Sequence, residues 1–353
     1  MTHISSFPYV KKGPLMKYLF PLLFFISISC EDNKTSTDVE VGEESLLFIL
    51  SEGSYGNSDG SISVFKNGDK IQTIENVGAN VQSLLVNEDK LFVAVTSSNK
   101  IIRYNITEAG LSLPGITIQT NNSGPRNMAI IGDELFFTNL YSKDIKIFNL
   151  ITFAIVDSIL LDGAPENIIS DGNYIWVSVP YLNYPDQGNG TSVIKIDVNN
   201  RTIENTYNIG RGPYDLLLND EILWISRTWY SEDYINSYHG SSSIDTQTGD
   251  ISIVDYGAGV VCGGNIMKLD DEIYRAWNGG VVPLDLNLDL ISGRQIGSYT
   301  NLYSAFSTSQ SLYLGTTDYS APDTVFIHDS DGILIQTLQV GVNPGDFTKW
   351  IIN

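Results

Sequence analysis

The sequence predicts an all-β fold, a seven-bladed β-propeller built from four-stranded antiparallel blades. Three observations predict it: one aromatic-containing strand recurs seven times, the segments around it recur with it, and the two ends of the repeating region complement each other. Repeats of about 40 to 50 residues that each hold several short strands are typical of propellers.

The recurring strand, which we call the marker strand, carries an aromatic side chain at its second or third residue. The intervals between these aromatics are 44, 44, 40, 48, 50 and 39 residues. A spacing this regular predicts one marker strand in each blade. The seven aromatics are Phe48, Phe92, Phe136, Trp176, Trp224, Tyr274 and Tyr313.

The segments on either side of the marker strand complete the unit. An alternating strand and a tight acidic turn precede it, as in "ENIIS" and "DGN", and a further strand and a polar turn follow it, as in "SVIKID" and "NNR". Alternating runs bounded by Asn, Asp and Gly predict short antiparallel strands. Each unit therefore forms four strands.

The ends of the repeat predict how the ring closes. The chain stops at "GDFTKWIIN", an innermost strand with no marker strand after it, whereas the first unit begins at "LLFIL" with no innermost strand before it. We expect the C-terminal strand to complete the first blade, because closure removes free sheet edges. The propeller is predicted to span residues 46–353.

A targeting segment precedes the propeller. "MKYLFPLLFFISISC", Met16 to Cys30, has one lysine, about ten apolar residues and then small residues. This length suits a secretory signal rather than a membrane span. Residues 1–29 are predicted to be a signal peptide that starts at Met1 or Met16. The sequence ahead of Cys30 resembles a bacterial lipobox, and we expect lipidation of this cysteine; the alternative is ordinary cleavage near Ser29, which leaves a spare thiol.

Residues 30–45 are polar and acidic, which predicts a flexible tether after the anchored cysteine. The sequence has 20 basic and 41 acidic residues, and loss of the three lysines in residues 1–29 leaves a net charge of −24. Such a surface repels phosphate backbones and anionic headgroups. Nucleic acid is thus excluded as a partner, and contact with the membrane is expected only through the lipid. If Cys30 is acylated, Cys262 has no partner for a disulfide.

Strand order predicts that the loops after the marker strands share one face with the crossovers between blades, and we call it the crossover face. These loops hold most of the aromatic residues outside strands, and Tyr and Trp offer a flat apolar area with a hydrogen-bonding edge. We expect them to converge on one rim that binds a flat amphipathic ligand or a protein; the alternative is that half of them plug the channel or pack loop on loop. The aromatics are Tyr55, Tyr181, Tyr184, Trp229, Tyr230, Tyr234, Tyr238, Trp277 and Tyr319, together with Tyr141. The polar candidates are Asn183, Gln187, Asn189, Asn236, Asn278 and His239.

A second set of polar residues lies at the starts of the innermost strands, beside the channel that runs through the centre of the predicted propeller. We expect these short side chains to cap the crossover turns through their own backbone rather than to contact a ligand. They are Ser83, Asn127, Asn167, Asp215, Asn265, Ser304 and Asp346.

No catalytic site, metal site or cofactor is predicted. The sequence lacks a Gly-x-Ser-x-Gly elbow, Cys/His zinc spacing, a phosphate loop and a dinucleotide fingerprint. His3 lies in the predicted signal peptide, and His328 is expected on the solvated surface. His239 is the one histidine on the aromatic rim, where it could ligate a metal that a ligand carries. A propeller lyase or hydrolase would need His239 beside an acid such as Asp233.

Three stretches carry a family resemblance. "GAPENIISDGNYIWVSVP" and "TSVIKIDVNNRTIENTYNIGRGPYDLLLNDEILWISR" resemble the YVTN or YncE-like seven-bladed propellers. "LFILSEGSYGNSDGSISVF" resembles the Bacteroidetes surface lipoproteins of that type, and the likeness covers residues 46–353. Members of that group capture vitamin B12 and other corrinoids and pass them to a TonB-dependent outer-membrane transporter.

The resemblance therefore implies a non-catalytic lipoprotein, anchored in the outer membrane and exposed on the cell surface, that binds a corrinoid on its aromatic face and delivers it to a transporter. Two alternatives stay open. A carbohydrate-binding accessory lipoprotein would use the same tyrosines, and a protein-interaction scaffold would dock a basic partner on the acidic rim.

Overall fold

The computed structural model describes residues 44–183, 188–259 and 264–352. Glu43–Asn353 forms one compact unit. The predicted signal peptide, Cys30 and nearly all of the predicted tether lie outside the described residues, and so do Tyr184, Gln187 and Cys262. Within the described ranges, no helix has the length and apolar character needed to cross a bilayer.

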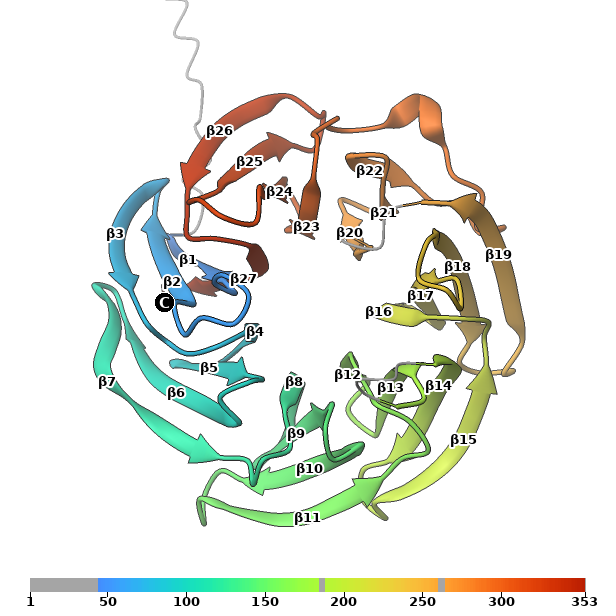
Figure 1. Cartoon of the computed structure of the whole chain (residues 1–353), viewed down its shortest axis with the longest axis horizontal. Helices are drawn as coiled ribbons and strands as arrows, with labels where there is room; N and C mark the ends of the chain where they lie inside the picture. Colours follow the sequence, from blue (N-terminus) through green and yellow to red (C-terminus); the bar gives the residue numbers. More distant parts are fainter. Residues whose placement is uncertain (1–43, 184–187, 260–263, 353) are drawn as a thin grey trace, which may run out of the picture. The chain divides into compact units, whose positions relative to one another are not determined.

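Seven antiparallel sheets are arranged in a ring, which confirms the predicted propeller (Figure 1). From the innermost strand outward, blade 1 consists of β27 (Pro344–Ile351), β1 (Ser45–Ser51), β2 (Ser61–Lys66) and β3 (Asp69–Ile74). Blade 2 consists of β4 (Val81–Asn87), β5 (Lys90–Val95), β6 (Lys100–Thr107) and β7 (Gly110–Gln119). Blades 3 and 4 consist of β8 (Pro125–Ile131), β9 (Glu134–Asn139), β10 (Asp144–Asn149) and β11 (Ala154–Leu160), and of β12 (Ile168–Ser170), β13 (Tyr174–Tyr181), β14 (Asn189–Asp197) and β15 (Thr202–Asn208).

The remaining three blades follow the same order, and one of them has only three paired strands. Blade 5 consists of β16 (Pro213–Asn219), β17 (Ile222–Tyr230), β18 (Ser237–Asp245) and β19 (Ile251–Ala258). Blade 6 consists of β20 (Ile266–Leu269), β21 (Glu272–Trp277) and β22 (Gly280–Pro283), and blade 7 of β23 (Leu302–Ser307), β24 (Ser311–Thr316), β25 (Thr324–Asp329) and β26 (Leu334–Gln339).

The marker aromatics explain how the blades hold together. All seven lie in the second strand of a blade, and each is at most 4% exposed. Each one packs with residues of the next blade: Phe48 of blade 1 shares a core cluster with Val93 of blade 2, and Trp176 of blade 4 shares one with Leu223 of blade 5. Full burial of such a side chain contributes about 1.5 to 3 kcal/mol to the stability of the folded state. The repeat in the sequence is therefore the repeat of the contacts between blades.

The first blade is completed from the other end of the chain, as predicted. β27 pairs with β1 along its whole length, from Ser45 opposite Ile351 to Ser51 opposite Pro344. A ring closed in this way leaves no innermost strand unpaired.

Blade 6 departs from the four-strand pattern at its outer edge. After β22 the chain makes isolated bridges between Val281 and Ile296 and between Leu284 and Leu290, with one 3-10 turn, η1 (Ser292–Arg294). The segment that leads on to blade 7, residues 298–301, lines a cavity on the crossover face. In blade 6 the chain therefore forms a loop where each of the other blades has its fourth strand.

Inner-strand polar side chains link consecutive blades, which only partly matches the prediction. Asp346 Oδ1 accepts a hydrogen bond from the backbone of Phe347 (2.8 Å), as expected of a cap, but its Oδ2 accepts from Leu84 N of the next blade (2.7 Å). Asp215 likewise accepts from Leu216 N (3.0 Å) and from Ile266 N of blade 6 (3.0 Å). These carboxylates reach across the interface because each innermost strand begins close to its neighbour.

Candidate functional site

The loops after the marker strands and the crossovers lie on one face, as predicted. The loop after β9 is bonded to the preceding crossover, since Tyr141 N donates to Ser123 O at 2.9 Å. The loop after β13 is held in the same way, since Ala164 N donates to Tyr181 O at 2.8 Å. This shared hydrogen bonding defines the crossover face.

The predicted ligand-binding residues share this face but do not converge on one rim. Most of the described candidates border four hollows, one of which, about 660 Å³, contains Trp229 and Tyr238. The channel mouth, about 400 Å³, contains Tyr55, Tyr141 and Tyr181. The blade 4–5 groove, about 520 Å³, contains Tyr181, Asn189, Trp229, Tyr230 and Tyr234. The blade 5–7 cavity, about 570 Å³, contains His239, Trp277, Asn278 and Tyr319.

In the blade 4–5 groove, internal packing already uses much of the aromatic surface. Trp229 is 8% exposed, and its ring stacks on that of Tyr238 with centroids 5.9 Å apart. The guanidinium of Arg227 lies 5.1 Å from the Trp229 ring centroid on the same β-hairpin. Tyr230 and Tyr234 are 38% and 53% exposed, with ring centroids 6.1 Å apart. Tyr230, at the end of β17, and Tyr234, on the loop that follows, therefore present the exposed aromatic surface of this groove.

The polar candidates are also dispersed. Asn183 is exposed and accepts a hydrogen bond from Lys143 Nζ at 3.2 Å, and Asn189 Nδ2 donates to Tyr230 O at 3.3 Å. Asn236 is exposed on the β17–β18 loop. Asn278 and His239 are the members of this set that border the blade 5–7 cavity, among the described residues.

The blade 5–7 cavity is formed where the ends of three blades meet. His239 comes from β18, Trp277 ends β21, and Tyr319 follows β24. Between them the chain turns at Gly279, whose φ is +80° and where a Cβ would lie 2.4 Å from the carbonyl oxygen of Tyr299. Only glycine permits this close approach, which sets the loop of residues 298–301 against blade 6.

Tyr299 forms one side of the cavity and was not among the predicted site residues. Its ring stacks on Phe326 with centroids 4.0 Å apart, and its hydroxyl lies 2.7 Å from His328 Nε2. His328 Nδ1 lies 3.0 Å from Gly332 O, and the side chain is 5% exposed. The prediction of a solvated His328 is therefore wrong, because both ring nitrogens have protein partners that compensate for burial.

His239 is buried in the cavity wall instead of standing on an open rim. It is 7% exposed, and its ring lies 5.5 Å from that of Tyr256. Burial, and then the charge of Arg275, lower the pKa of His239 to about 4. The imidazole is neutral at physiological pH. Among the described residues, no group of three His, Cys, Asp or Glu side chains is placed to hold a metal ion.

Arg275 lies beside His239 in the same wall, on β21, and is 1% exposed. Its Nη2 donates to the carbonyl oxygen of Arg227 at 3.1 Å. Its Nε and Nη1 have no hydrogen-bond partner within the described part of the chain. A charged residue inside "IYRAW", an otherwise apolar marker strand, was the available signal in the sequence.

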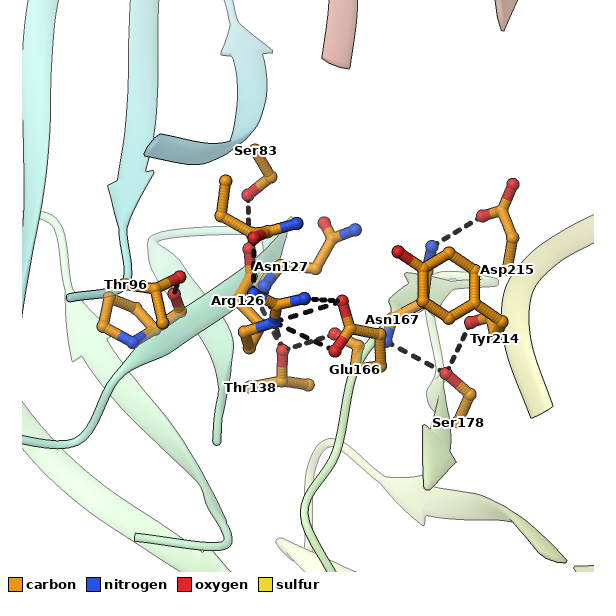
Figure 2. Close-up of polar contacts among 12 residues, drawn as sticks. Ser83, Thr96, Arg126, Asn127, Thr138, Glu166, Asn167, Ser178, Tyr214 and Asp215 are labelled. Carbon is orange, nitrogen blue, oxygen red and sulfur yellow. Dashed lines mark hydrogen bonds and ion pairs between the residues drawn. The ribbon is translucent and has the colours of Figure 1, made fainter. Parts of the chain in front are cut away.

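In the central channel, in contrast to the surroundings of Arg275, an arginine is paired with a carboxylate. Arg126 on β8 donates from Nε to both carboxylate oxygens of Glu166, at 2.9 and 3.1 Å, and from Nη1 to Gln82. Figure 2 shows the Arg126 and Glu166 side chains pointing toward one another from neighbouring blades. Thr138 Oγ1 donates to Glu166 O at 2.8 Å and so fixes the backbone of the acid. Each of the three guanidinium nitrogens of Arg126 therefore has a protein partner.

Three carboxyls around the channel are held in an environment that disfavours their charge. Burial raises the pKa of Glu52 to about 7 and that of Asp346 to about 7, and it raises the pKa of Asp215 to about 6. The cavity that these inner strands line has a volume of about 440 Å³. Its acids are engaged in joining blades, as the hydrogen bonds of Asp215 and Asp346 show.

Comparison with known proteins defines the fold and no more. No protein-family model matches the sequence. No curated protein matches it either.

Solved structures match over most of the chain at low sequence identity. A protein from Bacteroides fragilis described as a candidate 6-phosphogluconolactonase is 15% identical, with a TM-score of 0.61 over 88% of this chain and 98% of that one. AztD from Citrobacter koseri is 12% identical, with a TM-score of 0.55 over 87% and 98%. BamB from Moraxella catarrhalis is 13% identical, with a TM-score of 0.55 over 86% and 85%. At these identities the similarity shows a shared propeller fold and carries no activity across.

Proposed function

We propose that this protein is a non-catalytic binding protein that holds a small molecule in the blade 5–7 cavity. The observation that carries the proposal is the composition of this cavity: about 570 Å³, with Trp277, Tyr299 and Tyr319 beside amide and hydroxyl groups. Ligand pockets of about 300 to 1,000 Å³ typically combine aromatic walls with a few polar groups in this way. A propeller supports such a site by fixing its loops on rigid blades.

A corrinoid is the first ligand to test, on the strength of the resemblance to the B12-capturing lipoproteins. A cavity of this size would enclose part of a corrinoid, and the remainder would lie over Tyr319, which is 54% exposed. A glycan is the alternative, because sugars stack on the same aromatic surfaces. We further propose lipidation at Cys30, exposure on the cell surface and transfer of the ligand to a TonB-dependent transporter.

Binding is favoured over catalysis by the surroundings of His239. The acid that a lyase or hydrolase would pair with it, Asp233, is exposed and bonded to the hydroxyl of Ser231. Catalytic dyads need the base and its partner within hydrogen-bond reach. Neither imidazole nitrogen of His239 has such a partner among the described residues.

A second candidate function, docking of a protein partner, is favoured by the β17–β18 loop. Ile235 is 78% exposed there beside Tyr234, which is 53% exposed, and Glu232 and Asp233 flank them. Exposed apolar residues within an acidic rim suit a partner with a basic surface around an apolar contact. In the proposed function this partner is the transporter.

Calorimetric titration of the full chain with cyanocobalamin tests the proposal. The cavity variant Trp277→Ala with Tyr319→Ala is compared with the groove variant Trp229→Ala with Tyr230→Ala. Binding that is lost in the cavity variant and kept in the groove variant is the expected result. Loss in the groove variant alone would move the site to blades 4 and 5, and no heat would discard the corrinoid in favour of glycans tested with the same proteins.

A further inference from the structure

Arg275 is a buried cation without a close ion pair: the carboxylate whose charge acts on it, that of Asp215, forms no salt bridge with it among the described residues. It is 1% exposed, and no ion pair within residues 44–183, 188–259 and 264–352 involves it. The neighbouring Arg227 is a like charge and is itself paired with Asp255. The ring of Tyr256, 5.6 Å from the guanidinium carbon of Arg275, gives a cation–π contact only.

An unpaired buried charge lowers the stability of the folded protein, and a bound partner of opposite charge would offset that loss. A guanidinium taken out of water without compensating hydrogen bonds costs several kcal/mol. Burial lowers the pKa of Arg275 to about 10, so the side chain still carries its charge at neutral pH. One of its three nitrogens, Nη2, has a hydrogen bond, to Arg227 O.

The cavity beside Arg275 has an unusual composition for this chain. The sequence has 41 acidic and 20 basic residues, yet no Asp or Glu lies among the described residues that line the blade 5–7 cavity. The channel, its mouth and the blade 4–5 groove each have at least one acid in their walls. His239, the other titratable nitrogen base in the wall, is neutral at physiological pH and supplies no counter-charge.

We propose that the blade 5–7 cavity binds its ligand through an anionic group, a carboxylate or a phosphate, that pairs with Arg275. The inference rests on the proposed function and adds the chemical class of the ligand. Because Nε and Nη1 are shielded from bulk water, the anionic group reaches them only with a rearrangement of the guanidinium toward the cavity. Pairing there is stronger than at the surface, since the local dielectric is low.

Two inorganic probes test the inference on the full chain: sodium phosphate and sodium acetate, each against sodium chloride at equal ionic strength. We expect phosphate or acetate to raise the melting temperature of the wild type above that in chloride, because a ligand of the folded state stabilises it. Arg275→Met should abolish the difference and Arg275→Lys should keep part of it. Arg294→Met, which removes an exposed arginine of the same blade that is paired with Glu272, should leave the difference intact. An equal shift in wild type and Arg275→Met, or no shift in the wild type, would overturn the inference.

Tryptophan fluorescence gives a second measurement if Arg275→Met does not fold. Trp277 lines the cavity, so phosphate or acetate bound at Arg275 should change its emission, and Trp277→Phe should remove that change. A change that persists in Trp277→Phe would place the anion elsewhere. The two proposals fail separately: cyanocobalamin bound equally by wild type and Arg275→Met would keep the binding function and reject the anion, whereas an anion effect without corrinoid binding would reject only the corrinoid.

Discussion

Two arginines, the half-buried Arg126 in the channel and the buried Arg275 in the blade 5–7 cavity, show opposite uses of the same residue type. Arg126 donates to Glu166 and Gln82 from neighbouring blades. Arg275 has one backbone acceptor and no carboxylate partner within the described residues. The first arrangement joins blades, and the second leaves donors beside a cavity.

The comparison teaches where polar burial is structural and where it points to a ligand. A repeated fold must hold seven interfaces, and the channel does so with saturated networks. A group left unsaturated in an otherwise satisfied structure needs a separate explanation. This is why we place the ligand at blades 5 to 7 and not in the channel, although the channel has more charged residues.

The largest expected effect is on the channel side. Arg126→Met should lower the free energy of unfolding by about 3 to 5 kcal/mol, because it leaves the Glu166 carboxylate buried without its cation. Urea denaturation of the full chain measures this loss. The double variant with Glu166→Gln should recover part of it, since the uncompensated charge is then gone. A loss below about 1 kcal/mol would mean that the network does not join the blades.

Glu52 gives the next effect, a dependence of stability on pH. Its folded pKa, raised by burial to about 7, lies above the ordinary value of 4.5, so the folded state holds the proton more tightly than the unfolded state. Stability is therefore unaffected by this carboxyl below about pH 4.5 and falls as pH rises toward 7. Glu52→Gln should remove about 1 to 2 kcal/mol of that fall, after allowance for partial exposure to the channel. Urea denaturation at pH 5 and pH 8 measures it, and an unchanged slope would contradict the burial of this charge.

Removal of the unpaired arginine should have a smaller and opposite effect on stability. Without ligand, Arg275→Met should change the free energy of unfolding by less than about 1 kcal/mol or increase it, since an apolar side chain avoids the cost of a buried charge. Denaturation in chloride measures it beside Arg126→Met. A loss of more than about 2 kcal/mol would show that Arg275 is a structural residue like Arg126.

Much of the fold follows from the sequence because the markers are repeated. Phe48, Trp176 and Tyr313 all pack between neighbouring blades, so their regular spacing can be recognised in the sequence alone. Ring closure by the C-terminal strand follows from the same count. The three-stranded sixth blade was not predicted, because "VVPLDLNLDL" still has the apolar alternation of a strand.

The site was less predictable because concavity depends on which loops meet. The aromatic loops share one face, as their sequences indicate, but Trp229 and Trp277 belong to different hollows. Arg275, within β21, and Tyr299, in the segment before β23, lie outside the loops that follow the marker strands. His328 was misassigned because its two partners, Tyr299 and Gly332, become neighbours only through the fold.

A second effect of pH, on His239, sharpens the comparison from inside the cavity. Burial and the charge of Arg275 lower its pKa from 6.5 to about 4, so the folded state favours the neutral imidazole. Its contribution to stability is therefore full above about pH 6.5 and is lost as pH falls toward 4. His239→Gln should remove a dependence on the order of 1 kcal/mol, opposite in sign to that of Glu52.

Arg275→Met supplies the control for the effect on His239, because removal of the neighbouring charge should raise the pKa of His239. The C2 proton resonance of the imidazole, followed by NMR against pH, measures that pKa in both proteins. An unchanged midpoint would mean that the guanidinium charge does not reach the imidazole. The charge of Arg275 would then be screened by protein groups, and the proposal that the cavity binds an anion would be rejected. A raised midpoint would place an unpaired charge beside His239, where a ligand's anionic group can pair with it.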